Sequence, residues 1–85
     1  MAKLTVLGIM ISNRVKNAPQ VQKILTEFGC NIKTRLGLHE VNDTTCSTSG
    51  LILLELCGDE SACIELERQL RELKGIQVQK MLFET

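Results

Sequence analysis

The sequence predicts a small α+β domain in which strands and helices follow the order β-α-β-β-α-β. An aliphatic run rich in β-branched residues opens the chain, as a strand does. Two later segments carry apolar residues at helical spacing, and each is followed by a glycine. Between them lie one alternating stretch and one aliphatic stretch, which are typical of strands. With 85 residues there is room for one folded unit, so residues 1–85 are expected to form a single domain.

The first half of the chain is predicted to be a strand followed by a helix. The strand runs from Lys3 to Ile11 and ends at the polar loop Ser12 to Asn17. Asn17 is predicted to cap the helix, Pro19 lies in its first turn, and Gly29 supplies a left-handed stop. The residues that give this helix its apolar spacing are Val21, Ile24, Leu25 and Phe28.

The second half is predicted to contain three strands and one helix. Ile32 to His39 alternates as a strand with one covered face does, and Leu51 to Cys57 forms the next, aliphatic strand. The turn Gly58 to Ser61 leads into a helix that ends at Gly75, and the last strand opens at Ile76. The buried stripe of this helix is expected to be Cys63, Leu66, Leu70 and Leu73.

Right-handed β-α-β crossovers place both helices on one face of a four-stranded antiparallel sheet, the ferredoxin-like arrangement. The first and third strands are then central, and both carry more aliphatic residues than one covered face requires. Those expected to face the helices are Leu4, Val6, Met10, Ile52, Leu54 and Leu56, and those expected to face away are Leu7, Ile9, Ile11, Leu51 and Leu53. We therefore expect a homo-oligomer, a dimer or a tetramer, that covers the open sheet face. The alternative is that one strand is shifted in phase by one residue.

Composition argues against several classes of function. Ten basic residues balance ten acidic ones, so no net positive field attracts a nucleic-acid backbone or an anionic membrane. Phe28 and Phe83 are the only aromatic residues, which leaves none on the central strands to stack on bases. No nucleophile paired with a base is visible, so an enzyme is not expected. The opening segment has no long apolar run, and a cytoplasmic location is expected.

The loop after the first strand is the first candidate site. In the predicted topology Ser12 to Asn17, the turn at Gly75 and the tip of the central hairpin share one end of the sheet. Asn13 and Arg14 offer amide and guanidinium donors that suit a carboxylate or phosphate, and Arg35 is expected on the open face. The alternative is a solvated loop with a salt bridge at its rim.

The hairpin tip is the second candidate site, for a metal ion. His39 and Cys46 could supply an imidazole nitrogen and a thiolate to zinc, nickel or copper, with further ligands from Glu40, Asp43 or a neighbouring subunit. The alternative is a hydrogen-bonded histidine at a strand end. The other cysteines are expected at the opposite end of the sheet, packed as small hydrophobes: Cys30, Cys57 and Cys63.

Several segments together resemble the small bacterial family of iron-only hydrogenase system regulators, which have an ACT-like, ferredoxin-like fold. These segments are Ile9 to Arg14, Thr34 to Gly37, the aliphatic third strand and Leu70 to Val78. The resemblance covers nearly the whole chain, and Gly37 is counted with the expected ligand residues. That family is similar in turn to the C-terminal metal-sensing domain of the nickel-responsive repressor, where a His and a Cys help to bind nickel. His39 and Cys46 resemble that pair, but the repressor's further histidines and its DNA-binding ribbon have no counterpart here.

These features predict a non-enzymatic regulatory domain that senses a small molecule or a metal ion at the loop end of an oligomer. The resemblance implies a transcription or hydrogenase-system regulator, with nickel or zinc as the expected metal. The alternative is a structural module that docks another protein without a small ligand.

Overall fold

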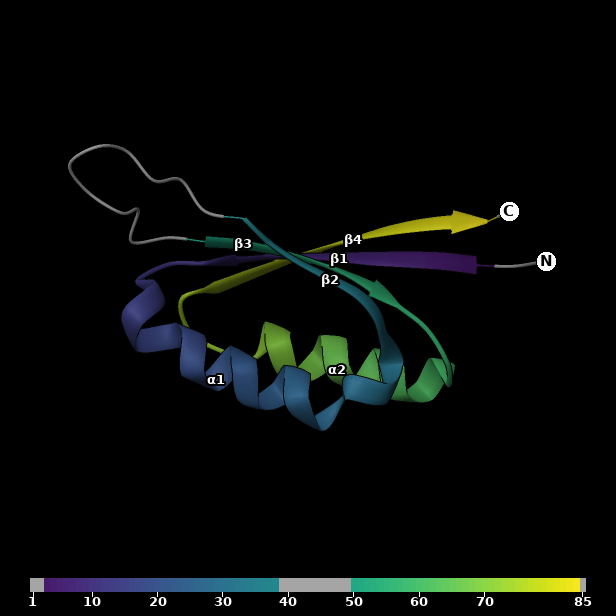
Figure 1. Ribbon diagram of the computed structural model, residues 1–85, viewed down its shortest axis with the longest axis horizontal. Helices are drawn as coiled ribbons and strands as arrows, with labels where there is room; N and C mark the ends of the chain where they lie inside the picture. The colour runs from purple at the N-terminus through teal and green to yellow at the C-terminus, as the bar shows by residue number, and fades with distance from the viewer. Residues whose placement is uncertain (1–2, 39–49, 85) are drawn as a thin grey trace.

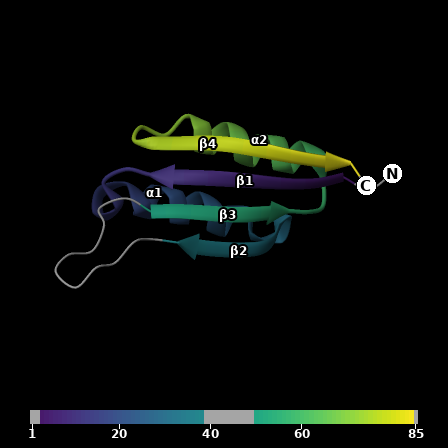
Figure 2. The same ribbon diagram turned by 90° about the horizontal axis from the view of Figure 1, so that it is seen from above.

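A computed structural model describes residues 3–38 and 50–84 of the chain and confirms the predicted order of elements. The elements are strand β1 at Lys3–Ile11, helix α1 at Arg14–Glu27, a short 3-10 helix at Gly29–Asn31, β2 at Ile32–Leu38, β3 at Gly50–Leu56, helix α2 at Glu60–Arg71 and β4 at Ile76–Glu84. The strands form one antiparallel sheet in the order β2-β3-β1-β4, so β1 and β3 are central as predicted. Both helices cover one face of this sheet (Figure 1, Figure 2), which is the ferredoxin-like arrangement. Neither helix in the described stretches is long and apolar enough to cross a membrane.

The hydrophobic core lies between the sheet and the two helices. Every second residue of β3, and of β1 from Leu7 onward, is buried there, because a strand with one covered face alternates between core and surface. Each helix contributes two fully buried residues at helical spacing. The buried core residues are Leu7, Ile9, Ile11, Val21, Leu25, Ile52, Leu54, Leu56, Leu66, Leu70 and Val78.

The predicted phase of β1 is wrong by one residue. The side chains that face the helices are Leu7, Ile9 and Ile11, and those that face away are Leu4, Val6 and Met10. Both sets are aliphatic, so alternation along β1 cannot distinguish them. Pairing with β3 decides the phase, because Leu7 lies opposite Leu54 and Ile9 lies opposite Ile52, and these two β3 residues do face the helices as predicted.

A register shift near the start of β2 changes which side chains of this strand face the helices. Ile32 pairs with Leu56 and packs against the core, but two residues later Thr34 pairs with Glu55 on the other face. The extra residue in β2 reverses the alternation that follows it. Leu36 consequently faces away from the helices and is 50% exposed. Arg35, predicted on the open face, lies instead on the helix side of the sheet.

Helix α1 begins at Arg14, earlier than the predicted cap at Asn17. Its N-cap is Asn13, which adopts a left-handed conformation with φ of 51° and makes no capping bond with its side chain. Pro19 therefore lies inside the helix rather than in its first turn. The predicted left-handed stop at Gly29 is also wrong, because this glycine begins the short 3-10 helix without a positive φ.

The sheet face opposite the helices, called here the open face, carries aliphatic side chains from all four strands and one aromatic ring from β4. They are Leu4, Val6, Met10, Leu36, Leu51, Leu53, Met81 and Phe83. Leu36, Met81 and Phe83 are each about half exposed. The edge strands contribute polar residues to this face, Thr34 from β2 and Gln77 and Gln79 from β4. The Thr34 hydroxyl donates a hydrogen bond to Glu55 of the central strand β3 at 3.2 Å.

Candidate functional site

The loop that follows β1 and the turn that precedes β4 are joined at one end of the sheet, as predicted. The backbone N–H of Ser12 donates to the carbonyl of Gly75 at 2.9 Å, and the Asn17 side-chain amide donates to the carbonyl of Ser12. Gly75 has a φ of 76°, a left-handed conformation that costs other residues energy. A Cβ added at Gly75 would overlap the Asn17 amide. This turn therefore holds the start of α1 beside the end of α2.

A hollow of about 570 Å³, called here the loop-end site, opens between these two segments. Two lysines, Lys16 from α1 and Lys74 from the turn before β4, line it together with the side chains of Asn13 and Asn17. Among the described residues that line it, Glu72 is the one acidic residue, and it accepts a hydrogen bond from Arg68 at 2.8 Å. The remaining charges and amide donors suit an anion such as a carboxylate or phosphate.

The first turn of α1 lies at the loop-end site, and two of its backbone N–H groups are paired within the helix. The carbonyl of Asn13 accepts from the N–H groups of Lys16 and Asn17, both at 3.0 Å. The first turn carries no acidic residue, and the cap makes no side-chain bond. The positive end of the helix dipole is therefore not compensated by a carboxylate from its own first turn.

The four predicted ligand residues do not share this hollow. Asn13 lines it, and Arg14, as the first residue of α1, follows Asn13 directly. Arg35 instead donates to the Gln22 side chain on α1, and Gly37 lies on the edge strand opposite Ile52. Of the predicted ligand residues, Asn13 therefore lies at the hollow, and Arg35 and Gly37 lie apart from it.

Three lining residues of the loop-end site were not singled out from sequence. Lys16 and Lys74 look like ordinary solvated lysines, and Asn17 was assigned to a cap instead of a bridge to Ser12. Gly75 is the feature of the sequence that could have indicated these residues. A left-handed turn at Gly75 places Lys74 next to the loop that follows β1.

The predicted metal residues His39 and Cys46 lie outside the described residues, as do Glu40 and Asp43. Within residues 3–38 and 50–84, no group of three or more His, Cys, Asp or Glu side chains could hold a metal ion.

The three cysteines at the other end of the sheet lie near one another, as predicted. The Cys63 thiol lies 3.4 Å from the carbonyl of Cys57, and the Cys57 thiol lies 3.8 Å from the carbonyl of Cys30. Burial, followed by the nearby Cys57, Asp59 and Glu60, raises the pKa of the Cys63 thiol. This thiol stays protonated and behaves as a small hydrophobe.

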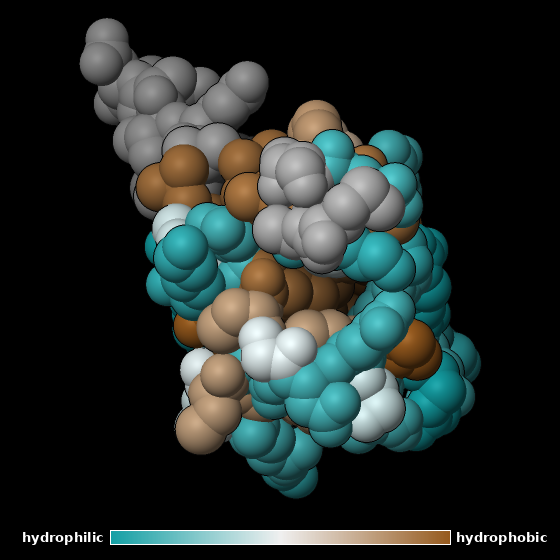
Figure 3. All heavy atoms as spheres, turned by 90° about the vertical axis from the view of Figure 1, so that its right-hand side faces the viewer, coloured by the Kyte–Doolittle hydropathy of each residue, from teal (hydrophilic) through white to brown (hydrophobic). Residues whose placement is uncertain are grey.

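A second hollow, of about 430 Å³, lies at this cysteine end, between α2 and the ends of β1 and β4. Figure 3 shows it as a recess with a hydrophobic floor between the two layers. Its lining includes Leu56, Cys63, Ile64 and Leu82.

Comparisons with known proteins establish the fold. No protein-family model and no curated protein matches the chain. The chain is similar to the solved structure of an uncharacterized protein from Thermotoga maritima, with 25% sequence identity and a TM-score of 0.80 over 98% of this chain and 100% of that one. It is also similar to a nitrogen regulatory PII-like protein from Thiomonas intermedia bound to ADP, AMP and bicarbonate, with 13% identity and a TM-score of 0.57 over 99% and 96% of the two chains.

A third similar structure is a formyltetrahydrofolate deformylase from Pseudomonas putida, with 12% identity and a TM-score of 0.57. The match covers 92% of this chain but 28% of the deformylase. The shared part is therefore a fraction of that enzyme. At such low identities these two comparisons show a common ferredoxin-like, ACT-like fold.

Proposed function

We propose that this chain is a non-enzymatic, homo-oligomeric regulatory domain that binds a small anionic ligand at the loop-end site. The observation that supports this most directly is the hollow of about 570 Å³ in which Lys16 and Lys74 lie beside the amides of Asn13 and Asn17. Ammonium and amide groups that converge on one hollow recognise carboxylate or phosphate groups. The PII-like protein with the same fold is a regulator bound to ADP, AMP and bicarbonate, which supports an anionic ligand by analogy of fold.

The finer assignment is to the hydrogenase-system regulators, and it rests on the resemblance of the sequence. In that assignment His39 and Cys46 form a weak zinc or nickel site that a neighbouring subunit completes, because two protein ligands rarely hold either metal tightly. Metal affinity then falls in acid, since imidazole protonates below a pKa of about 6.5 and a thiolate competes with protons.

Calorimetric titration with ADP and with bicarbonate tests the loop-end site. Lys74→Ala should weaken binding of the anion by about tenfold or more, the effect of losing one charge-assisted hydrogen bond. Lys23→Ala, which removes an exposed lysine of α1 outside the hollow, is the matched control and should bind as the native protein does. Equal affinity in native protein and Lys74→Ala would reject the loop-end site.

Native mass spectrometry of protein purified without chelator tests the metal. A stoichiometric metal adduct is expected, and it should disappear in both His39→Ala and Cys46→Ser. An adduct that persists in both variants, or none in the native protein, would reject this metal site.

A protein-docking module without a small ligand is the second candidate function. The exposed apolar side chains of the open face favour it, because such a patch is typical of interaction surfaces. Failure of every anion and metal to bind, together with an intact oligomer, would favour this alternative.

A further inference from the structure

The second hollow, called here the wedge, has apolar side chains of α2 and β4 among its lining residues. Ile64 of α2 is 58% exposed and Leu82 of β4 is 53% exposed, and both line it. On the sheet side of the wedge, Leu82 lies opposite Thr5 of β1. The small side chain of Thr5 also lines the wedge. The core residue Leu56 closes the inner end. Two large aliphatic side chains thus line a hollow that neither fills.

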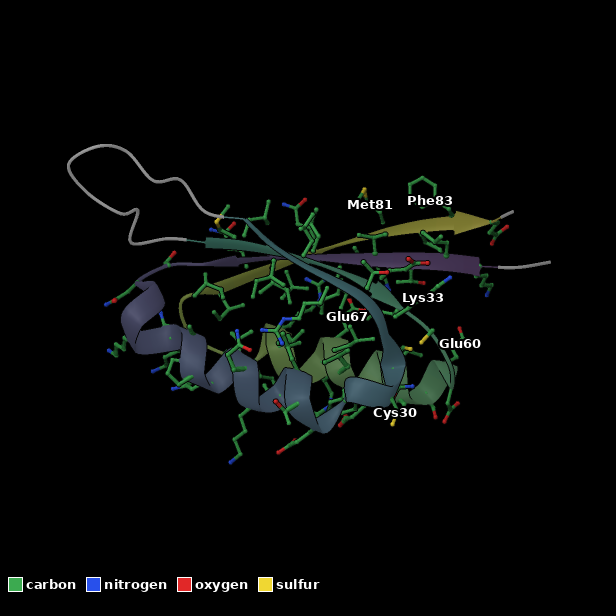
Figure 4. All side chains as sticks on the ribbon, viewed as in Figure 1. Cys30, Lys33, Glu60, Glu67, Met81 and Phe83 are labelled. Atoms are coloured by element: carbon green, nitrogen blue, oxygen red, sulfur yellow. The ribbon has the colours of Figure 1, made fainter. Side chains whose placement is uncertain are left out.

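An ion-pair network at Glu67 ties α2 to β4 in the wall of the wedge, which Glu67 and Lys80 both line. The Glu67 carboxylate accepts from Arg71 of α2 at 2.8 Å and from Lys80 of β4 at 3.1 Å, and Arg71 also donates to the carbonyl of Val78 at 2.7 Å. Figure 4 shows Glu67 between the helix and the sheet. The Glu67 side chain is only 17% exposed, so these contacts fix the spacing of the two layers at this position.

The charges around the wedge leave one cation without a partner among the described residues. Burial raises the pKa of Glu67, but hydrogen bonds from Arg71 and Lys80 outweigh it, so that the pKa is lowered and the carboxylate is matched by two cations. Glu60 lies in the first turn of α2, where the helix dipole stabilises a carboxylate. Lys3 lines the wedge from the outer end of β1, opposite Glu84 of β4. Within residues 3–38 and 50–84 its ammonium makes no ion pair, with Glu84 or with any other carboxylate.

We infer that the wedge binds a small carboxylic acid with an apolar tail, whose carboxylate meets Lys3 while the tail lies between Ile64 and Leu82. The volume of about 430 Å³ is in the range of small-molecule sites, which combine apolar walls with a few polar groups. The protonated thiol of Cys63 and the side chain of Leu56 extend the apolar surface inward. This site lies at the opposite end of the sheet from the loop-end site and does not depend on it.

Octanoate is the probe, and n-octanol, which has the same tail but no charge, is its neutral counterpart. In a methyl NMR titration octanoate should shift the signals of Ile64, Leu56 and Leu82 and leave those of Leu36 and Met10 on the open face in place. Octanoate should bind more tightly than n-octanol, and Lys3→Gln should remove that difference. Shifts confined to the open face, or equal affinity for the two probes in the native protein, would overturn the inference.

Two neighbouring residues of β4 provide a matched pair of variants. Leu82 and Phe83 are 53% and 49% exposed. Leu82 lies opposite Thr5 on the helix side of the sheet and lines the wedge, whereas Phe83 points away from the helices, as Figure 4 shows. Leu82→Gln should weaken octanoate binding about tenfold, and Phe83→Gln should leave it unchanged. If both variants fold and Phe83→Gln has the larger effect, octanoate binds the open face and the inference fails.

Discussion

At the scale of single residues, the loop-end site depends on one backbone conformation. Gly75 holds a left-handed φ of 76° beside the Asn17 amide, and its carbonyl accepts the hydrogen bond from Ser12. A side chain at position 75 costs free energy for two reasons: the positive φ strains an L-residue, and the added Cβ overlaps the Asn17 amide. Gly29 differs in both respects, since its φ is not positive and nothing lies within 4 Å of an added Cβ.

Gly75→Ala should therefore destabilise the protein by about 1–2 kcal/mol, the cost of a left-handed conformation for an L-residue, and more if Asn17 cannot move aside. Gly29→Ala is the control and should be neutral or stabilising by about 0.4–1 kcal/mol, because it removes freedom from the unfolded chain. Urea unfolding measures both. Equal stabilities of the two variants would mean that the turn at Gly75 relaxes without cost.

At the scale of elements, the sequence predicted which segments form strands and helices better than which side chains they bury. The span of β1 and the centrality of β1 and β3 are confirmed. The sequence did not indicate which face of β1 is buried, because Leu7 and Ile9 alternate with Leu4 and Val6, which are equally apolar. The extra residue in β2 is invisible in the sequence, since its effect appears only through pairing with β3.

The candidate site was predicted in part for a similar reason. Asn13 was found because amide donors in a loop are distinctive, and the structure does place it at the loop-end site. Lys16 and Lys74 are distant in sequence and resemble any exposed lysine. Tertiary contacts bring their segments together, namely the pairing of β1 with β4 and the bond between Ser12 and Gly75.

The position of Pro19 inside α1 gives a prediction for this helix. A helix that starts at Arg14 places Pro19 more than one turn from the N-terminus, where proline removes a backbone hydrogen bond and crowds the carbonyl four residues earlier. The Pro19 side chain is exposed, so its removal loses little packing. Pro19→Ala should stabilise the protein by up to about 3 kcal/mol in urea unfolding.

A matched change elsewhere on the exposed surface of α1 is the control for that prediction. Lys23→Ala should change the stability by a few tenths of a kcal/mol, because Lys23 is exposed and Lys and Ala have similar helix propensities. If Pro19→Ala gains no more than Lys23→Ala does, the first turn from Arg14 onward contributes little to the stability of the helix.

At the scale of the whole molecule, the open face is the largest feature that the fold leaves unexplained. Apolar side chains from all four strands reach it, and Leu36, Met10, Met81 and Phe83 are between 38% and 50% exposed. Soluble monomers rarely expose a contiguous apolar surface of this kind. The polar residues toward its edges resemble the rim of a protein interface. We therefore retain the prediction of a dimer or a tetramer through the open face, although the corrected phase of β1 changes its members.

Leu36 and Ile64 provide the comparison that tests this prediction. Leu36 lies on the open face and is 50% exposed, and Ile64 lies on α2 and is 58% exposed, so a lysine at either position stays hydrated in an isolated subunit. In the oligomer only the lysine at position 36 is buried without a partner, which costs several kcal/mol out of a total stability of about 5–15 kcal/mol. Analytical ultracentrifugation at micromolar concentration should show oligomers for the native protein and Ile64→Lys, and monomers for Leu36→Lys. Leu53→Lys, at the centre of the sheet, should give monomers or precipitate. An intact oligomer in both open-face variants would place the interface elsewhere.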